Sequence, residues 1–169
     1  MLKKQGLYDP QFEHDSCGVG FVVNVSGTRT HQIVSDGVTI LKNLVHRGAV
    51  GGDLKTGDGA GMLTQLPHEF MRKVCTPAGI SLPESGAYGV GMLFLPLESD
   101  ARAKAVALTE KAVADEGGTV LGWRDVPVNP DCLGEMAREN MPDIRQLFVT
   151  FDGLTGDAIE SKLYVLRKE

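Results

Sequence analysis

The chain has 169 residues and a mass of 18.1 kDa, which is the usual size of one globular domain with its own core. Its net charge of -5 and pI near 5.4 give no sign of a nucleic-acid partner or of binding to an anionic membrane. No apolar run approaches the roughly 20 residues that a membrane-spanning helix needs.

The cysteines and histidines argue against a disulfide framework and against a metal site. The three cysteines, Cys17, Cys75 and Cys132, are odd in number and contain no CxxC pair, which suits a reducing cytoplasm. The four histidines show no metal-ligand spacing. Residues 1–16 lack the apolar segment of a secretory signal, and local rules leave them as a disordered terminus.

Cys17 lies where a polar lead-in gives way to the apolar residues 21–23. Gly18 and Gly20 beside it leave the backbone bare, so another group can approach the thiol closely. A lone cysteine is more often a small buried core residue. The two glycines, which weaken a strand, and the small Ser16 before the thiol favour an accessible cysteine here.

Removal of residues 1–16 would place a thiol and a free α-amine on the same residue, Cys17. An α-amine has a pKa of about 7.7–8.0, so at neutral pH it can act as a general base toward its own thiol. The sequence permits this arrangement without requiring that the bond after Ser16 be cut.

The first half of the chain predicts a strand over residues 21–25 and a second, short strand over 31–34. A helix capped by Ser35 or Asp36 is then predicted from its apolar spacing to end near Gly48. Arg47 in its last turn fits simple complementation of the helix dipole. Residues 49–61 are rich in glycine but match no nucleotide-binding fingerprint, and they predict a tight turn into a strand over 62–66.

The second half alternates helices and strands. Helices are predicted over residues 68–74, over 100–115 with Ser99 as cap, from Asp131 to Arg138, and from Thr155 toward Lys168. Strands are predicted over 88–95, 119–126 and 144–151. This order indicates a layered α/β protein, and local rules alone leave open whether its sheet is parallel or mixed.

Several longer motifs recur in one family, in the same order along nearly the whole chain. They are residues 6–10, 13–20, 46–49, 56–61, 65–68, 121–128, 144–149 and 162–168. Together they resemble the large subunit of glutamate synthase. The first domain of that family is a class II glutamine amidotransferase of the N-terminal-nucleophile hydrolase type.

The resemblance implies an α/β (α+β) fold with four layers, two mainly antiparallel sheets between helices, of which this chain is expected to hold only part. It implies a propeptide-like leader at residues 1–16 and the N-terminal part of the amidotransferase domain at 17–169. Cys17 would be the nucleophile, supported by Gly18, Arg47 and Gly48. Arg47 then has a second interpretation beside the helix dipole, since an Arg-Gly pair of this class helps to hold the cysteine loop.

The implied reaction is hydrolysis of the side-chain amide of L-glutamine, with ammonia passed to 2-oxoglutarate elsewhere in the cytoplasmic enzyme of glutamate biosynthesis and nitrogen assimilation. The resemblance places FMN and an iron–sulfur cluster only in downstream domains, so no cofactor is expected in this chain. The expected partners are those domains or a separately encoded protein, with no nucleic acid and no membrane.

This sequence departs from the family pattern in one respect. The family's domain is longer, and its further part carries an Arg that grips the substrate carboxylate and an Asn-Gly pair that forms the oxyanion hole. No Asn-Gly pair occurs here. Because an oxyanion donor is worth about 10²–10³ in kcat, the alternative expectation is a catalytically incomplete fragment or split subunit that acts as a partner module.

Overall fold

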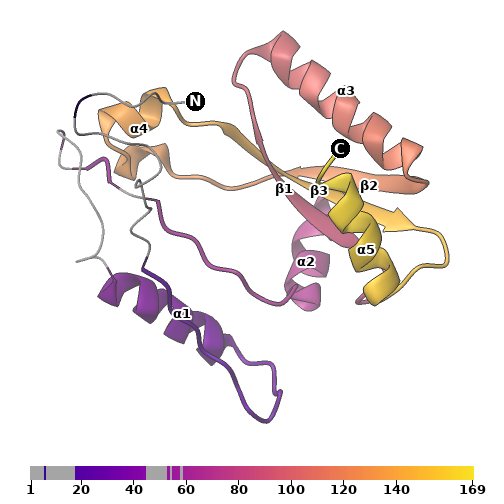
Figure 1. Cartoon of the computed structure of the whole chain (residues 1–169), viewed down its shortest axis with the longest axis horizontal. Helices are drawn as coiled ribbons and strands as arrows, with labels where there is room; N and C mark the ends of the chain where they lie inside the picture. The colour runs from indigo at the N-terminus through magenta and orange to yellow at the C-terminus, as the bar shows by residue number, and fades with distance from the viewer. Residues whose placement is uncertain (1–5, 7–17, 45–52, 54, 58) are drawn as a thin grey trace. The chain divides into compact units, whose positions relative to one another are not determined.

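The computed structural model describes residues 6, 18–44, 53, 55–57 and 59–169. The chain divides into two compact units, an N-terminal unit, Met1–Thr64, and a C-terminal unit, Gln65–Glu169. Figure 1 shows the elements of both. Among the described residues, no helix has the length and apolar character needed to span a membrane.

The N-terminal unit is built on one helix, α1 (His31–Asn43), with Thr30 extended before it and Leu44 as its C-cap. The predicted strand over residues 31–34 is therefore wrong, because these residues form the first turn of α1. The reason lies in the apolar spacing: Ile33, Gly37, Ile40 and Leu44 recur every three or four residues and are all half-buried, so one helical face uses them together.

The predicted strands over 21–25 and 62–66 are also absent from the structure as described. A strand requires a neighbouring backbone to complete its ladder of hydrogen bonds, and neither segment pairs with one among the described residues. The first segment ends in a turn in which the Gly27 N–H donates to the Asn24 carbonyl at 2.9 Å.

The C-terminal unit contains a three-stranded antiparallel sheet. Its strands are β1 (Gly89–Leu95), β2 (Gly118–Asp125) and β3 (Asp143–Phe151), in the order β1-β3-β2. All three predicted strands are confirmed to within one residue at each end. The mixed helix-and-strand class and the antiparallel pairing agree with the resemblance. The second sheet of the four-layer arrangement stays a prediction, since the described strands form one sheet.

The helices of this unit are α2 (His68–Cys75), α3 (Ser99–Asp115), α4 (Glu135–Glu139) and α5 (Asp157–Leu166), with short 3-10 turns η3 (Thr76–Ala78) and η4 (Pro130–Cys132). The long helix α3 is confirmed, but its cap is Glu98, whose carboxylate accepts from the N–H groups of Asp100 and Ala101 at 2.8 and 2.6 Å. The cap of α5 is Gly156 instead of Thr155.

The predicted helix from Asp131 to Arg138 is broken into two short pieces. Asn129 caps η4 by accepting from the Asp131 N–H at 3.1 Å. Leu133 is extended, and α4 starts only after Gly134. The side chain at 129 therefore takes the capping role that the sequence prediction gave to Asp131.

The sheet is covered on both faces by different helices (Figure 1). On one face, α3 and α5 cover a first core, whose members are Val113, Leu147, Val149, Phe151 and Ile159. On the other face, α2 buries a second core, whose members are Met71, Cys75, Ile80, Tyr88 and Phe148. Alternate residues of β3 thus enter opposite cores, as the period of two in a strand requires.

Candidate functional site

The predicted site residues fall in the N-terminal unit. Cys17, Arg47 and Gly48 lie outside the residues that the structure describes. Gly18 is described and exposed, directly after the predicted nucleophile. Of the predicted site residues, the structure therefore describes Gly18 alone.

Helix α1 contacts two other segments of the N-terminal unit. A Cβ added to Gly20 would collide with the side chain of Ile40, so the segment that follows Cys17 lies against the last turns of α1. A Cβ added to Gly37 would collide with the sulfur of Met62. Helix α1 ends at Asn43 with Leu44 as its C-cap, three positions before Arg47 in the sequence, and the same helix contacts the segment that follows Cys17.

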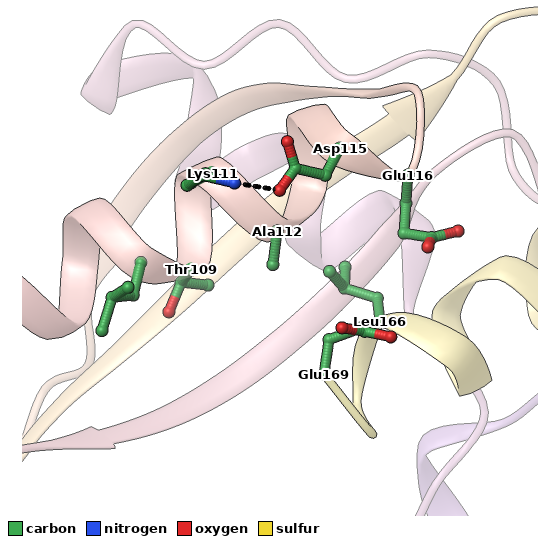
Figure 2. A pocket seen from close by; sticks show the side chains of 8 residues that line it. Thr109, Lys111, Ala112, Asp115, Glu116, Leu166 and Glu169 are labelled. Atoms are coloured by element: carbon green, nitrogen blue, oxygen red, sulfur yellow. Dashed lines mark hydrogen bonds and ion pairs between the residues drawn. The ribbon is translucent and has the colours of Figure 1, made fainter.

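A cavity of about 410 Å³ lies elsewhere, beside α3 and the end of α5 (Figure 2). Lys111 and Asp115 on its wall form an ion pair, and Glu116 accepts from Lys162 at 2.9 Å. The Thr109 hydroxyl donates to the Ala105 carbonyl. These polar groups already have partners, and no predicted site residue lines the cavity. It therefore offers little to orient a polar substrate such as glutamine.

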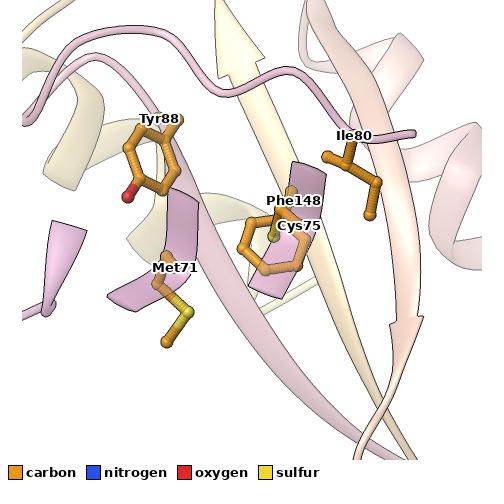
Figure 3. Close-up of a cluster of buried hydrophobic side chains, with 5 residues drawn as sticks. All are labelled: Met71, Cys75, Ile80, Tyr88 and Phe148. Carbon is orange, nitrogen blue, oxygen red and sulfur yellow. The ribbon is translucent and has the colours of Figure 1, made fainter. Parts of the chain in front are cut away.

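Two other thiols have environments that differ from each other. Cys75 is fully buried in the α2 core (Figure 3). Burial raises the pKa of its thiol, and the nearby charge of Arg124 only partly opposes that shift. Cys132 is exposed, and its sulfur donates to the Asn129 carbonyl at 3.1 Å. Because the thiolate is the nucleophile, Cys75 is chemically inert in the folded chain.

A polar pair that sequence reasoning did not single out lies at the edge of the same core. The Tyr88 hydroxyl and His68 Nδ1 are 3.1 Å apart, and Tyr88 is only 3% exposed. Burial, and then the proximity of Cys75, raise the pKa of the Tyr88 phenol. The bond joins the first residue of α2 to the residue before β1. No spacing in the sequence pairs His68 with Tyr88, because these residues meet only through the tertiary fold.

No group of three metal-ligating side chains, among His, Cys, Asp and Glu, comes together in the described part of the chain. Its thiols at Cys75 and Cys132 are free. The donor set required for a metal ion or an iron–sulfur cluster is therefore missing from these residues.

Comparison with known proteins gives consistent results. The chain is 46% identical over its whole length to the glutamate synthase [NADPH] large chain of Bacillus subtilis, covering 11% of that protein. It is 41% identical over 99% of its length to the glutamate synthase [NADH] of Schizosaccharomyces pombe, covering 8% of it. It is 42% identical over 92% of its length to ferredoxin-dependent glutamate synthase 2 of Synechocystis, covering 10%.

The chain thus spans about a tenth of the length of the curated relatives it matches. The family described as glutamine amidotransferases class-II matches residues 17–169, which is nearly the whole chain. The chain belongs to the class II glutamine amidotransferases.

Proposed function

We propose that this chain is the glutaminase part of a glutamate synthase, with Cys17 as an N-terminal nucleophile. The observation that carries the proposal is that the family match begins at Cys17 itself. A domain model that begins at this cysteine, with sixteen residues of the chain before it, is what removal of a leader predicts. The names of the similar proteins support glutamate synthase as the parent enzyme.

In the proposed reaction the α-amine of Cys17 takes the proton of the thiol, and the sulfur attacks the side-chain carbonyl carbon of glutamine. The carbon–nitrogen bond breaks, the amine returns the proton to the leaving nitrogen, and ammonia departs. Water then attacks the thioester carbonyl, the carbon–sulfur bond breaks, and glutamate leaves with the thiol restored. One residue thereby supplies both nucleophile and base.

The neighbouring residues support the nucleophile in this proposal. Gly18 is exposed and lacks a side chain, so substrate can reach the backbone beside the thiol. Arg47 and Gly48 would follow the end of α1, whose Ile40 already contacts the segment after Cys17 at Gly20. We infer that Arg47 helps to hold the cysteine loop, with Gly48 allowing the turn after it.

The ammonia would be consumed with 2-oxoglutarate in the rest of the protein, where FMN and an iron–sulfur cluster would act. The names of the similar proteins give different electron donors: NADPH, NADH or ferredoxin. The free thiols Cys75 and Cys132 support a reducing, cytoplasmic setting.

A second candidate is that the chain alone is a partner module that needs the remaining domain to become active. It is favoured by the segments over 21–25 and 62–66, which pair with no strand among the described residues. Val25 and Leu63 in these segments are 98% and 101% exposed. A partner that pairs with these segments would cover both side chains.

The test is the intact mass of the expressed chain, followed by labelling with 6-diazo-5-oxo-L-norleucine, a glutamine analogue that alkylates nucleophilic thiols. The proposal predicts loss of residues 1–16 and one label on Cys17. The matched control is Cys132→Ser, which removes the exposed thiol and leaves the labelling unchanged, whereas Cys17→Ala abolishes it.

An uncut, unlabelled chain would favour the partner-module function, and the remaining domain would then be supplied in trans. Recovery of cleavage and of ammonia release from glutamine would establish that the two polypeptides together form the active site. Labelling that persists in Cys17→Ala would exclude Cys17 as the nucleophile.

A further inference from the structure

Gly20 is a glycine for reasons of space and not of backbone conformation. Its φ lies outside the left-handed region that favours glycine. The backbone would therefore accept an alanine, but the Cβ of that alanine would collide with the Cγ2 methyl group of Ile40 on α1. The main chain of the segment that follows Cys17 thus lies directly against an α1 side chain.

Ile40 offers this segment a stiff surface. A β-branched isoleucine inside a helix has one strongly preferred χ1 rotamer, and α1 is a helix of 13 residues. Three positions earlier, Gly37 of the same helix accepts the sulfur of Met62 where a Cβ would collide. Because residues at i and i+3 are neighbours on a helix surface, one face of α1 contacts both segments.

The contact at Gly20 is three positions from the predicted nucleophile. Three residues span at most about 11 Å even when fully extended, so a shift of the main chain at Gly20 is transmitted to Cys17 through a short piece of backbone. In the proposed reaction the sulfur must meet the side-chain carbonyl carbon of glutamine. Misplacement of a reacting group by about 1 Å can lower a rate about 10²-fold.

We propose that Ile40 is a positioning residue for Cys17 and that the missing side chain of Gly20 is what allows it to act. The inference rests on the proposed function, because it gives Ile40 a role in the same reaction. That role is to fix the main chain that follows the thiol and the α-amine, and not to contact the substrate.

The test adds the excluded methyl group. Gly20→Ala is expected to lower the limiting rate at which 6-diazo-5-oxo-L-norleucine labels Cys17 by about tenfold to a hundredfold. The reagent concentration that gives half of the limiting rate should change little, because only the nucleophile is displaced. Ile40→Leu in the same chain should restore most of the rate, since leucine keeps the side-chain volume but has no methyl group on its β carbon.

The matched control is Gly61→Ala. Gly61 belongs to the same unit, its φ also lies outside the left-handed region, and an added Cβ would meet no atom within 4 Å. This variant is expected to be labelled like the unmodified chain. Circular dichroism of each variant establishes that the fold persists.

Labelling of Gly20→Ala at the rate of the unmodified chain would overturn the inference and leave the proposed function intact. A loss that Ile40→Leu does not relieve, or that Gly61→Ala shares, would overturn it as well. If the unmodified chain is neither cut nor labelled, even with the remaining domain supplied in trans, the proposed function fails and the inference falls with it.

Discussion

The two units of the chain differ in where they keep their apolar residues. The C-terminal unit buries them in two cores on opposite faces of one sheet, with Phe148 and Val113 fully enclosed. In the N-terminal unit, α1 has no buried residue, and Phe21 and Val23 are 89% and 70% exposed. The predicted nucleophile nevertheless belongs to the N-terminal unit.

The residues that stabilise the fold and the residues predicted to act on substrate therefore lie in different units. Residues that fix the fold are gathered in the C-terminal unit, where the sheet, α2, α3 and α5 enclose their own side chains. The residues predicted to act on glutamine lie in a unit whose described helix, α1, has no buried residue. The C-terminal unit should therefore unfold cooperatively, while the N-terminal unit contributes little to that transition.

The largest expected effect is that of Phe148→Ala. Phe148 is fully buried on the central strand, so its removal should lower the free energy of unfolding by about 3–5 kcal/mol, as measured by urea denaturation. The paired variant Phe21→Ala, at an 89% exposed position, should change it by no more than about 0.5 kcal/mol. Equal losses would contradict the separation of the two units.

A smaller loss is expected where a glycine is packed against a helix in each unit. A Cβ at Gly89 would collide with Leu163 of α5, so Gly89→Ala should cost about 1–3 kcal/mol in thermal or urea unfolding. When Leu163→Ala is present as well, Gly89→Ala should lower the free energy of unfolding far less. A double-mutant cycle measures this coupling. Gly20→Ala against Ile40 in the N-terminal unit should leave the main transition in place.

Removing one carboxylate at the start of β3 should lower the free energy of unfolding by about 1 kcal/mol. Asp143 accepts a hydrogen bond from Arg145 Nε at 3.0 Å, and its carboxylate lies 3.5 Å from Nε of Arg102 on α3. Asp143→Asn keeps the shape and removes the charge, so the loss should shrink as salt is added. A loss independent of salt would assign the role of Asp143 to its hydrogen bond with Arg145 and not to its net charge. The measurement is urea denaturation at low and high ionic strength.

The smallest expected effect concerns the cap of α3. Backbone N–H groups of Asp100 and Ala101 hold the pKa of the Glu98 carboxyl below its usual value. A carboxyl with a lowered pKa in the folded state stabilises the fold at neutral pH. That contribution is lost as pH falls from the usual carboxylate range through the lower folded pKa. Glu98→Gln should therefore be less stable than the unmodified chain at pH 7, and the difference should vanish in acid.

Sequence reasoning succeeded where local signals and tertiary packing agree. The alanine-rich helix α3 ends before the glycines at 117 and 118, and the strands β1 and β3 are apolar runs between turns. These elements need no knowledge of their neighbours to be recognised. The order of the strands, with the last one in the centre, was not predictable from such local patterns.

It failed where an element depends on something distant. Residues 21–25 have the composition of a strand, but composition cannot provide the neighbour that a ladder needs. Residues 31–34 have two apolar side chains that suit either a strand or a helix. They form the first turn of α1 because apolar residues continue at helical spacing as far as Leu44. For the candidate site, the motif around Cys17 identified the family. The contact between Gly20 and Ile40 required the tertiary structure.

The order β1-β3-β2 also has a consequence for synthesis of the chain. Since β1 and β2 pair only with β3, neither strand finds its neighbour within this unit until Asp143–Phe151 has been made. A ribosome adds about 5–20 residues per second, so the uncharged strand Gly89–Leu95 waits on the order of seconds without a partner. During that interval the nascent chain presents an unpaired apolar segment, which is a surface prone to aggregation. Slower translation between residues 96 and 142 would lengthen its exposure.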